Sequence, residues 1–241
     1  MIALMAPMNW ANAGQRPFAF TYEAETAPAG TLEFEQWVTW KADKESNGDF
    51  EEFSFREEIE YGLTDRLQLG VYIADWSITR GTDDDGTRYK DSGFDLIYNL
   101  TDPTKDALGS ALYGEVLIGP EKFVLEGKLL LQKNIGKWTL AYNAVVEAEW
   151  EGENYTEDVG VWKNTFGVSY QINPSLTVGA EAVHEVEFAG WEDAGDHAFY
   201  AGPNFSWRKK NFFVVVAPLF QVTDIADEAD FMTRAIFGIH F

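Results

Sequence analysis

The last eleven residues of the chain form an alternating pattern that ends on an aromatic side chain. Phe231, Ala235, Phe237, Ile239 and Phe241 share one side of this pattern. Because successive side chains of a β-strand point to opposite faces, a period of two predicts a strand with one apolar face. This pattern constrains the fold more than any other feature, since the remaining strands must pair with such a strand and bury or cover its apolar face.

Composition favours one large all-β domain and excludes several functions. Hydrophobic residues make up 46% of the 241 residues, but no apolar run approaches the roughly 18 residues of a membrane helix. The chain has no cysteine, so it has neither disulfides nor thiolate sites. A net charge of -22 opposes nucleic-acid binding, because phosphate backbones are also negative.

Strand-like segments bounded by turn residues recur along the chain, and helical periodicity is nowhere sustained. Short turns alternate with mostly longer, acidic connections, as in outer-membrane barrels. In a barrel with an even number of strands both chain ends lie at the same end of the barrel, which in an outer-membrane barrel is the periplasmic end. Residues 17–26 also alternate, so a thirteenth strand there is the alternative. Twelve strands are expected, at residues 30–42, 49–63, 66–79, 90–100, 110–119, 122–133, 138–150, 157–172, 175–189, 197–207, 211–223 and 229–241.

Residues 138–150 are the best test of a membrane location. Trp138 and Trp150 stand at the two ends of an alternating apolar face. Twelve steps of about 3.3 Å, tilted near 45°, give roughly 28 Å of height, close to the apolar band of a membrane barrel. Trp138, Trp150 and Phe241 are therefore expected in the aromatic girdles. A soluble β-sandwich could carry the same alternation in its core and remains the alternative fold.

The N-terminal part of the chain has the features of a processed leader. Residues 1–13 are mostly apolar or small and end in Ala11-Asn12-Ala13, which resembles a signal-peptide cleavage site. The basic region that precedes such a segment is missing, so an ordinary N-terminal arm is the alternative. We expect residues 1–13 to be a signal-peptide remnant, residues 14–29 a periplasmic lead-in, and residues 30–241 the barrel.

Two stretches resemble uncharacterised outer-membrane β-barrel proteins of proteobacteria, of a kind similar to porins and transporters. They run from Pro17 to Thr39, with Pro28-Ala29-Gly30 before the first strand, and from Tyr61 to Leu69. The terminal Phe241 is a familiar signature of the same class. The resemblance implies an all-β, transmembrane, antiparallel up-and-down barrel in the outer membrane. It also implies contacts with lipid and lipopolysaccharide, and binding of the C-terminal strand by the barrel-assembly machinery.

One register aligns the apolar side chains of the first hairpin, with Trp40 opposite Phe53. On the other face this register sets Glu33 against Glu60 and Glu35 against Glu58, so a positive group or a bound cation is expected nearby. The expected lumen acids are Glu33, Glu35, Glu58, Glu60, Glu126, Glu147, Glu149, Glu181 and Glu185, with Asp95, Glu115 and Glu187 as further candidates. The expected lumen bases are Arg56, Lys128, Lys163 and Arg234, with Arg66 and His240 as further candidates.

The same register makes Gln36 and Glu57 neighbours in the middle of the otherwise apolar outer face. A carboxylate at mid-bilayer costs a few kcal/mol, so something should offset it. One interpretation is a contact with another subunit, which would make the barrel a homo-oligomer. The alternative is a β-bulge that turns Glu57 inward.

The inward acids predict a narrow channel or transporter for small, cation-leaning solutes, with Glu33, Glu35, Glu58 and Glu60 setting the field. Arg56 and Arg234 would then form the constriction. The alternatives are a structural or partner-binding barrel whose charged interior is filled, and an envelope enzyme acting on lipid or peptide. An enzyme is not expected, because none of the three histidines stands in a His-x-Ser arrangement. No metal or cofactor motif is present.

Overall fold

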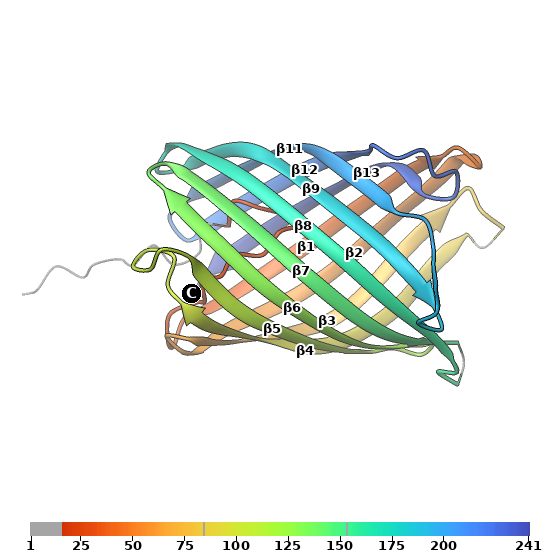
Figure 1. Ribbon diagram of the computed structural model, residues 1–241, viewed down its shortest axis with the longest axis horizontal. Helices are drawn as coiled ribbons and strands as arrows, with labels where there is room; N and C mark the ends of the chain where they lie inside the picture. The colour runs from red at the N-terminus through yellow and green to blue at the C-terminus, as the bar shows by residue number, and fades with distance from the viewer. Residues whose placement is uncertain (1–15, 84, 153) are drawn as a thin grey trace, which may run out of the picture.

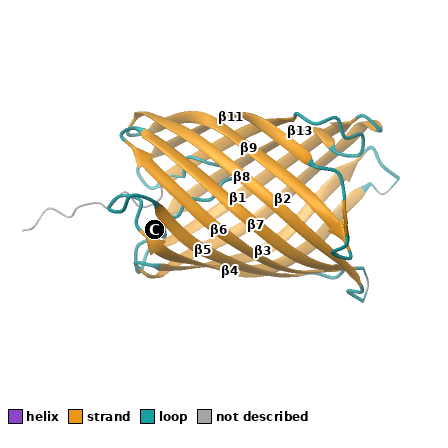
Figure 2. Cartoon of the chain, viewed as in Figure 1, coloured by secondary structure: helices purple, strands orange, loops and turns teal. Residues whose placement is uncertain are grey.

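The protein is a closed, tilted β-barrel in a computed structural model that describes residues 16–83, 85–152 and 154–241 (Figures 1 and 2). The expected signal-peptide remnant, residues 1–13, lies outside the described residues. The strands are β1 (Leu32–Lys44), β2 (Asn47–Thr64), β3 (Leu67–Arg80), β4 (Gly86–Thr101), β5 (Gly109–Ile118), β6 (Lys122–Ile135), β7 (Trp138–Glu151), β8 (Glu157–Asn173), β9 (Leu176–Ala189), β10 (Asp193–Ala194), β11 (Ala198–Lys209), β12 (Phe212–Gln221) and β13 (Ala229–His240).

Every long strand pairs antiparallel with its neighbours, and the pairings of β13 with β1 and of β8 with β9 leave no open edge. The twelve predicted strands are confirmed, with ends that shift by a few residues. β10 is a two-residue addition to β9 in the connection that precedes β11. The alternative strand within residues 17–26 is wrong, because this segment forms no strand. Closure of the sheet excludes the two-sheet sandwich.

The predicted register of the first hairpin is confirmed. β1 pairs with β2 so that Trp40 faces Phe53, Glu35 faces Glu58 and Glu33 faces Glu60. The Trp40 and Phe53 rings stack with their centroids 5.8 Å apart. The apolar pairs and the acidic pairs therefore occupy opposite faces of the same hairpin, as the period of two requires.

Large apolar side chains are exposed on the outer face of the barrel, and several carboxylates are buried on its inner face. Leu112, Phe94 and Phe166 on the outer face are 40 to 50% exposed, whereas Glu35, Glu58 and Asp95 on the inner face are at most 1% exposed. Large apolar side chains that face outward on every long strand need an apolar surrounding. Among the described residues, no helix is long and apolar enough to cross a membrane.

Aromatic side chains lie at both ends of the barrel wall. Trp138 begins β7 and packs against Tyr170, while Trp150 near the end of β7 packs against Phe123. The last residue, Phe241, is 75% exposed and its backbone N–H donates to the Leu32 carbonyl at the start of β1. We call the end of the barrel that holds Leu32 and Phe241 the terminal end, and the opposite end the loop end.

Candidate functional site in the barrel lumen

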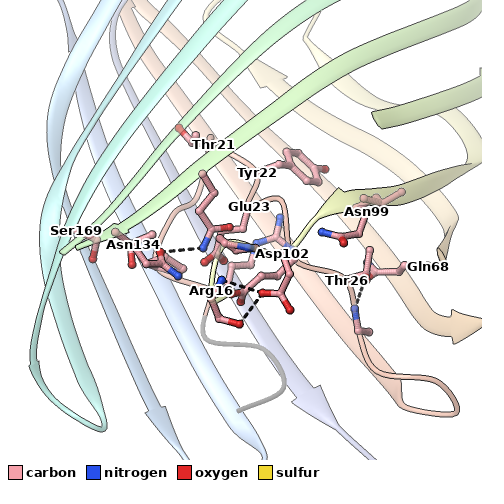
Figure 3. Close-up of a pocket in the computed structure, with 18 of the residues that line it drawn as sticks. Arg16, Thr21, Tyr22, Glu23, Thr26, Gln68, Asn99, Asp102, Asn134 and Ser169 are labelled. Atoms are coloured by element: carbon pink, nitrogen blue, oxygen red, sulfur yellow. Dashed lines mark hydrogen bonds between the residues drawn. The ribbon is translucent and has the colours of Figure 1, made fainter. Parts of the chain in front are cut away.

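Residues 16–24, which we call the N-terminal segment, lie inside the barrel and pass between its walls (Figures 1 and 3). Phe18, Ala19, Phe20, Thr21 and Ala24 are between 0 and 9% exposed. The expectation of a lead-in outside the barrel is therefore wrong for this part of the chain. Phe18 lies directly over the wall at Gly167, where a Cβ would be 2.6 Å from its ring.

The Glu181 carboxylate on β9 anchors this segment. It accepts hydrogen bonds from three consecutive backbone N–H groups, those of Ala19 at 2.7 Å, Phe20 at 2.8 Å and Thr21 at 2.9 Å. Asn204 on β11 holds the carboxylate from the other side, with its Nδ2 3.2 Å from Oε1. A buried carboxylate is stabilised by such donors, and charge-assisted bonds of this kind are stronger than neutral ones.

Side-chain amides of the wall satisfy much of the remaining backbone of the segment and of the residues that follow it. Asn143 on β7 accepts from the Tyr22 N–H at 2.7 Å and donates to the Tyr22 carbonyl at 2.9 Å. This exchange of two bonds is what a neighbouring strand would provide. The other amide partners are Gln132 for the Ala24 N–H, Asn99 for the Ala24 carbonyl, Gln68 for the Ala27 N–H and Asn204 for the Pro17 carbonyl.

Cationic and aromatic side chains surround the segment in the middle of the lumen. Arg234 lies 4.5 Å from the Phe20 ring and 5.1 Å from the Trp37 ring, and donates to Thr39 Oγ1 at 3.0 Å. On the opposite wall the Lys128 ammonium lies 4.2 Å from the ring of Tyr22. Cation–π contacts of this kind are strongest where water is excluded. The segment and the wall residues that contact it therefore occupy the middle of the lumen.

The predicted lumen acids and bases face inward with one exception, and several of them form ion pairs with one another or with other side chains of the lumen. Arg56 Nη2 lies 2.6 Å from Asp75 Oδ2, and its Nη1 lies 3.6 Å from Glu115 Oε2. Arg66 is an exception among the further candidates, because it lies in the exposed turn between β2 and β3. Other ion pairs of the lumen wall are Lys128 with Glu126, Lys163 with Glu147 and Glu185, Lys122 with Glu149, and His240 with Glu33.

Three of the predicted acids converge on one point of the terminal half of the lumen. Carboxylate oxygens of Glu35, Glu58 and Glu60 lie within 4.8 Å of one another. The positive group that the sequence required nearby is Arg16, whose Nη1 lies 2.5 Å from Glu35 Oε2 and 3.8 Å from Glu60 Oε1. Trp37 Nε1 also donates to Glu35 Oε2, at 2.6 Å. We call Glu35, Glu58 and Glu60 the glutamate triad.

Two cavities lie in the lumen, one toward each end, and Tyr22 of the N-terminal segment lines both. The terminal-end cavity has a volume of about 600 Å³, and Figure 3 shows the segment beside the wall side chains that line it. The loop-end cavity has a volume of about 460 Å³. Among the described residues that line them, acidic side chains outnumber Lys and Arg in both cavities.

One acid at the rim of the terminal-end cavity keeps its charge at low pH. Asp102, in the connection after β4, accepts a hydrogen bond from the Lys105 ammonium at 2.6 Å and one from the Thr104 hydroxyl. These bonds, that of Lys105 first, lower the pKa of Asp102 to about 2. Asp102 therefore stays ionised, and paired with Lys105, over the whole physiological pH range.

The outer wall keeps the predicted polar pair. Gln36 faces Glu57 across the β1–β2 pairing, and the Gln36 amide donates to the backbone carbonyls of Trp37 and Arg56. A bulge does occur opposite Glu57, but its extra residue is Ile73 on β3. Glu57 stays between Arg56 and Glu58, whose side chains face the lumen, so the interpretation of a bulge that turns it inward is wrong.

The sequence did not predict two features of this arrangement. The first is the hydrogen bonding of wall Gln and Asn side chains to the backbone of the N-terminal segment. Gln and Asn at inward-facing strand positions would have indicated it in the sequence. The second is a contact between His184 and His197, whose ring nitrogens lie 2.9 Å apart, with Asn164 3.2 Å from His184 Nδ1. His184 lies on β9 and His197 lies in the connection directly before β11, so their spacing along the chain gave no sign of this contact.

The fold is similar to that of solved outer-membrane barrels. The COG4313 outer membrane channel from Pseudomonas putida F1 has a TM-score of 0.63 at 14% identity, over 90% of this chain and 98% of that one. The NanC porin has a TM-score of 0.58 at 9% identity, over 86% and 98%. The KdgM porin in complex with disordered oligogalacturonate has a TM-score of 0.53 at 10% identity, over 88% and 98%.

These similarities show that the protein has the fold of bacterial outer-membrane β-barrels, and its outward apolar surface suits a barrel that spans a membrane. At sequence identities this low the similarities show a shared fold, and they do not assign a function to any residue of this site. A search of curated proteins finds no match. Residues 10–232, nearly the whole chain, match a family described as being of unknown function, DUF6662, and the chain belongs to that family.

Proposed function

We propose that this protein is a narrow outer-membrane channel for small, cation-leaning solutes, closed at rest by its own N-terminal segment. The observation that carries the proposal is the position of that segment between two polar cavities. A segment held by side-chain hydrogen bonds, with no strand pairing, can leave without breaking the barrel. Barrels of the same fold that are described as a channel and as porins support a conducting role.

The charge of the cavities supports the preference for cations. Seven carboxylates and two Lys or Arg side chains line the terminal-end cavity among the described residues. Ten carboxylates and seven Lys or Arg side chains line the loop-end cavity. A cleft lined by one sign of charge concentrates the opposite ion. Glu33 and the glutamate triad would set the negative electrostatic potential of the path. Arg56 and Arg234 would line the opening through the middle of the lumen once the segment has left.

Planar-bilayer recordings test the proposal. We expect the wild-type barrel to be closed for most of the time and its open level to pass cations over anions. In the double variant Glu35→Gln/Glu58→Gln the preference for cations should fall several-fold, because two negative charges beside the path are removed.

The control is Glu45→Gln/Asp49→Asn, which removes two exposed charges near the turn between β1 and β2. Its selectivity should remain that of the wild type. Absence of conductance in every variant would reject the channel, and an unchanged permeability ratio in Glu35→Gln/Glu58→Gln would reject the proposed role of these acids.

One observation favours a second function, that of a barrel which binds a partner through its outer wall. Glu57 lies in the middle of the apolar outer face, and no cation pairs with it among the described residues. We propose that a second copy of the chain covers this wall and offsets the cost of the carboxylate, which alone would be about 1–3 kcal/mol in the bilayer.

Under this proposal, Glu57→Leu should shift the protein from oligomer to monomer in detergent, because the polar contact between copies is lost. Cross-linking and light scattering would measure the shift. Ile59→Leu on the same face is the matched control and should leave the oligomer intact. If Glu57→Leu leaves both oligomeric state and stability unchanged, the second function fails.

A further inference from the structure

We propose that the glutamate triad is a binding site for a hard divalent cation of the Ca²⁺ class, and that the Arg16 guanidinium takes the place of this cation in the closed barrel. The triad has the required spacing, because its carboxylate oxygens lie within 4.8 Å of one another. Two oxygens that bind the same Ca²⁺ at about 2.3–2.6 Å can lie up to about 5 Å apart.

Buried oxygens without partners point independently to a missing positive ligand. Glu35 Oε1 and Glu58 Oε2 of the triad accept no hydrogen bond, and neither does Asp95 Oδ2 on β4. Asp95 is 1% exposed, and its Oδ2 shares with Glu58 Oε1 the space over Gly70, where a Cβ would lie 2.0 and 2.7 Å from them. A buried acceptor without a partner is unfavourable, and a fourth carboxylate aimed at the triad adds to the repulsion.

The charge of Arg16 is too small for this group. Arg16 contacts Glu35 and Glu60, and no ion pair of the described residues reaches Glu58 or Asp95. The nearest other bases are engaged, since Arg56 pairs with Asp75 and Lys128 pairs with Glu126. A divalent cation would neutralise two charges at once and could bind the oxygens that a planar guanidinium leaves unpaired.

The ligand chemistry selects the class of ion. Every donor of the site is a carboxylate oxygen, which suits Ca²⁺ and Mg²⁺ and disfavours metals that prefer nitrogen or sulfur. Three carboxylates from two adjacent strands do not form an octahedron, and Ca²⁺ tolerates such irregular geometry better than Mg²⁺ does. Glu35 and Glu60 line the terminal-end cavity, so the ion can reach the site from that end.

Cation and guanidinium compete for the same oxygens, so the binding of one weakens the binding of the other. This inference rests on the proposed function in one respect, namely that Arg16 belongs to the segment that closes the lumen. A divalent cation in the triad would remove one attachment of that segment and favour the open state.

Terbium(III) luminescence tests the site on the folded barrel in detergent micelles. Tb³⁺ replaces Ca²⁺ in oxygen sites, and the Trp37 indole, which donates to Glu35, can sensitise its emission. We expect a saturable signal that Ca²⁺ displaces. Glu58→Gln should weaken Tb³⁺ binding tenfold or more, and Arg16→Met should strengthen it tenfold or more, because the competing charge is gone.

Glu60→Gln is the second variant and should also weaken binding, while the exposed Glu45→Gln is the matched control and should not. Folding of each variant is checked by heat-modifiable migration. Unchanged affinity in both Glu58→Gln and Glu60→Gln would overturn the site, and unchanged affinity in Arg16→Met would overturn the competition. Tb³⁺ luminescence does not depend on conductance. If bilayer recordings show no conductance while Tb³⁺ binding is intact, the channel is rejected and the cation site is not.

Discussion

Glu181→Gln should open the barrel. The carboxylate accepts three backbone N–H groups of the N-terminal segment, and the amide that replaces it has one acceptor oxygen and adds two donors in a site full of donors. Hydrogen bonds to a charged group are each worth about 1.5–3 kcal/mol. Loss of about 3 kcal/mol raises the fraction of barrels with a released segment roughly 100-fold. Single-channel recordings should show a large rise in open probability.

Glu192→Gln is the matched control, because it removes one negative charge just beyond the end of β9, at an exposed position. Its open probability should remain that of the wild type. Protease accessibility of the segment gives a second reading that does not depend on conductance. If Glu181→Gln leaves both open probability and protease accessibility unchanged, the carboxylate does not hold the segment.

Arg56→Met should destabilise the barrel more than any change at its outer surface. The guanidinium pairs with Asp75 and Glu115 and lies 4.0 Å from the Tyr72 ring. Met keeps much of the volume but leaves two inward carboxylates without a counter-charge. Breaking a buried pair in this way costs about 3 kcal/mol, at the low end of the usual range. Urea unfolding from lipid vesicles, or the temperature at which heat-modifiable migration is lost, would measure the effect.

Lys90→Met is the control for Arg56→Met. Its ammonium pairs with Glu52 at 3.3 Å, but the Lys90 side chain is 42% exposed. Exposed pairs contribute about 0–1 kcal/mol, so this variant should unfold close to the wild type. A loss below about 1 kcal/mol for Arg56→Met would mean that water already screens the Arg56 pairs.

The barrel itself could be predicted because its information is local and periodic. A period of two decides which side chains share a face, and pairing Trp40 with Phe53 brings the other pairs of that hairpin into register. The same period of two and the same register also predicted the inward position of Glu33, Glu35, Glu58 and Glu60. Even the need for a positive group beside them followed, because two opposed glutamate pairs repel.

The identity of that positive group could not be predicted. Arg16 reaches Glu35 because Glu181, Asn143 and Gln132, from strands more than 100 residues away along the chain, hold the backbone that follows it. None of these residues belongs to a motif, and each is an ordinary polar side chain on an inward face. The alternation of residues 17–26 suggested a strand, but wall side chains satisfy its backbone where a strand neighbour would otherwise be needed.

The sequence by itself determined the strands, their faces and the register of the first hairpin, because alternation and side-chain pairing act between residues that are close in the chain or directly opposed. Only the tertiary structure decided where the N-terminal segment lies and what Arg16, Arg234 and Glu181 contact. Those contacts exist only after twelve strands have closed, since closure brings the inward side chains of distant strands together around one axis.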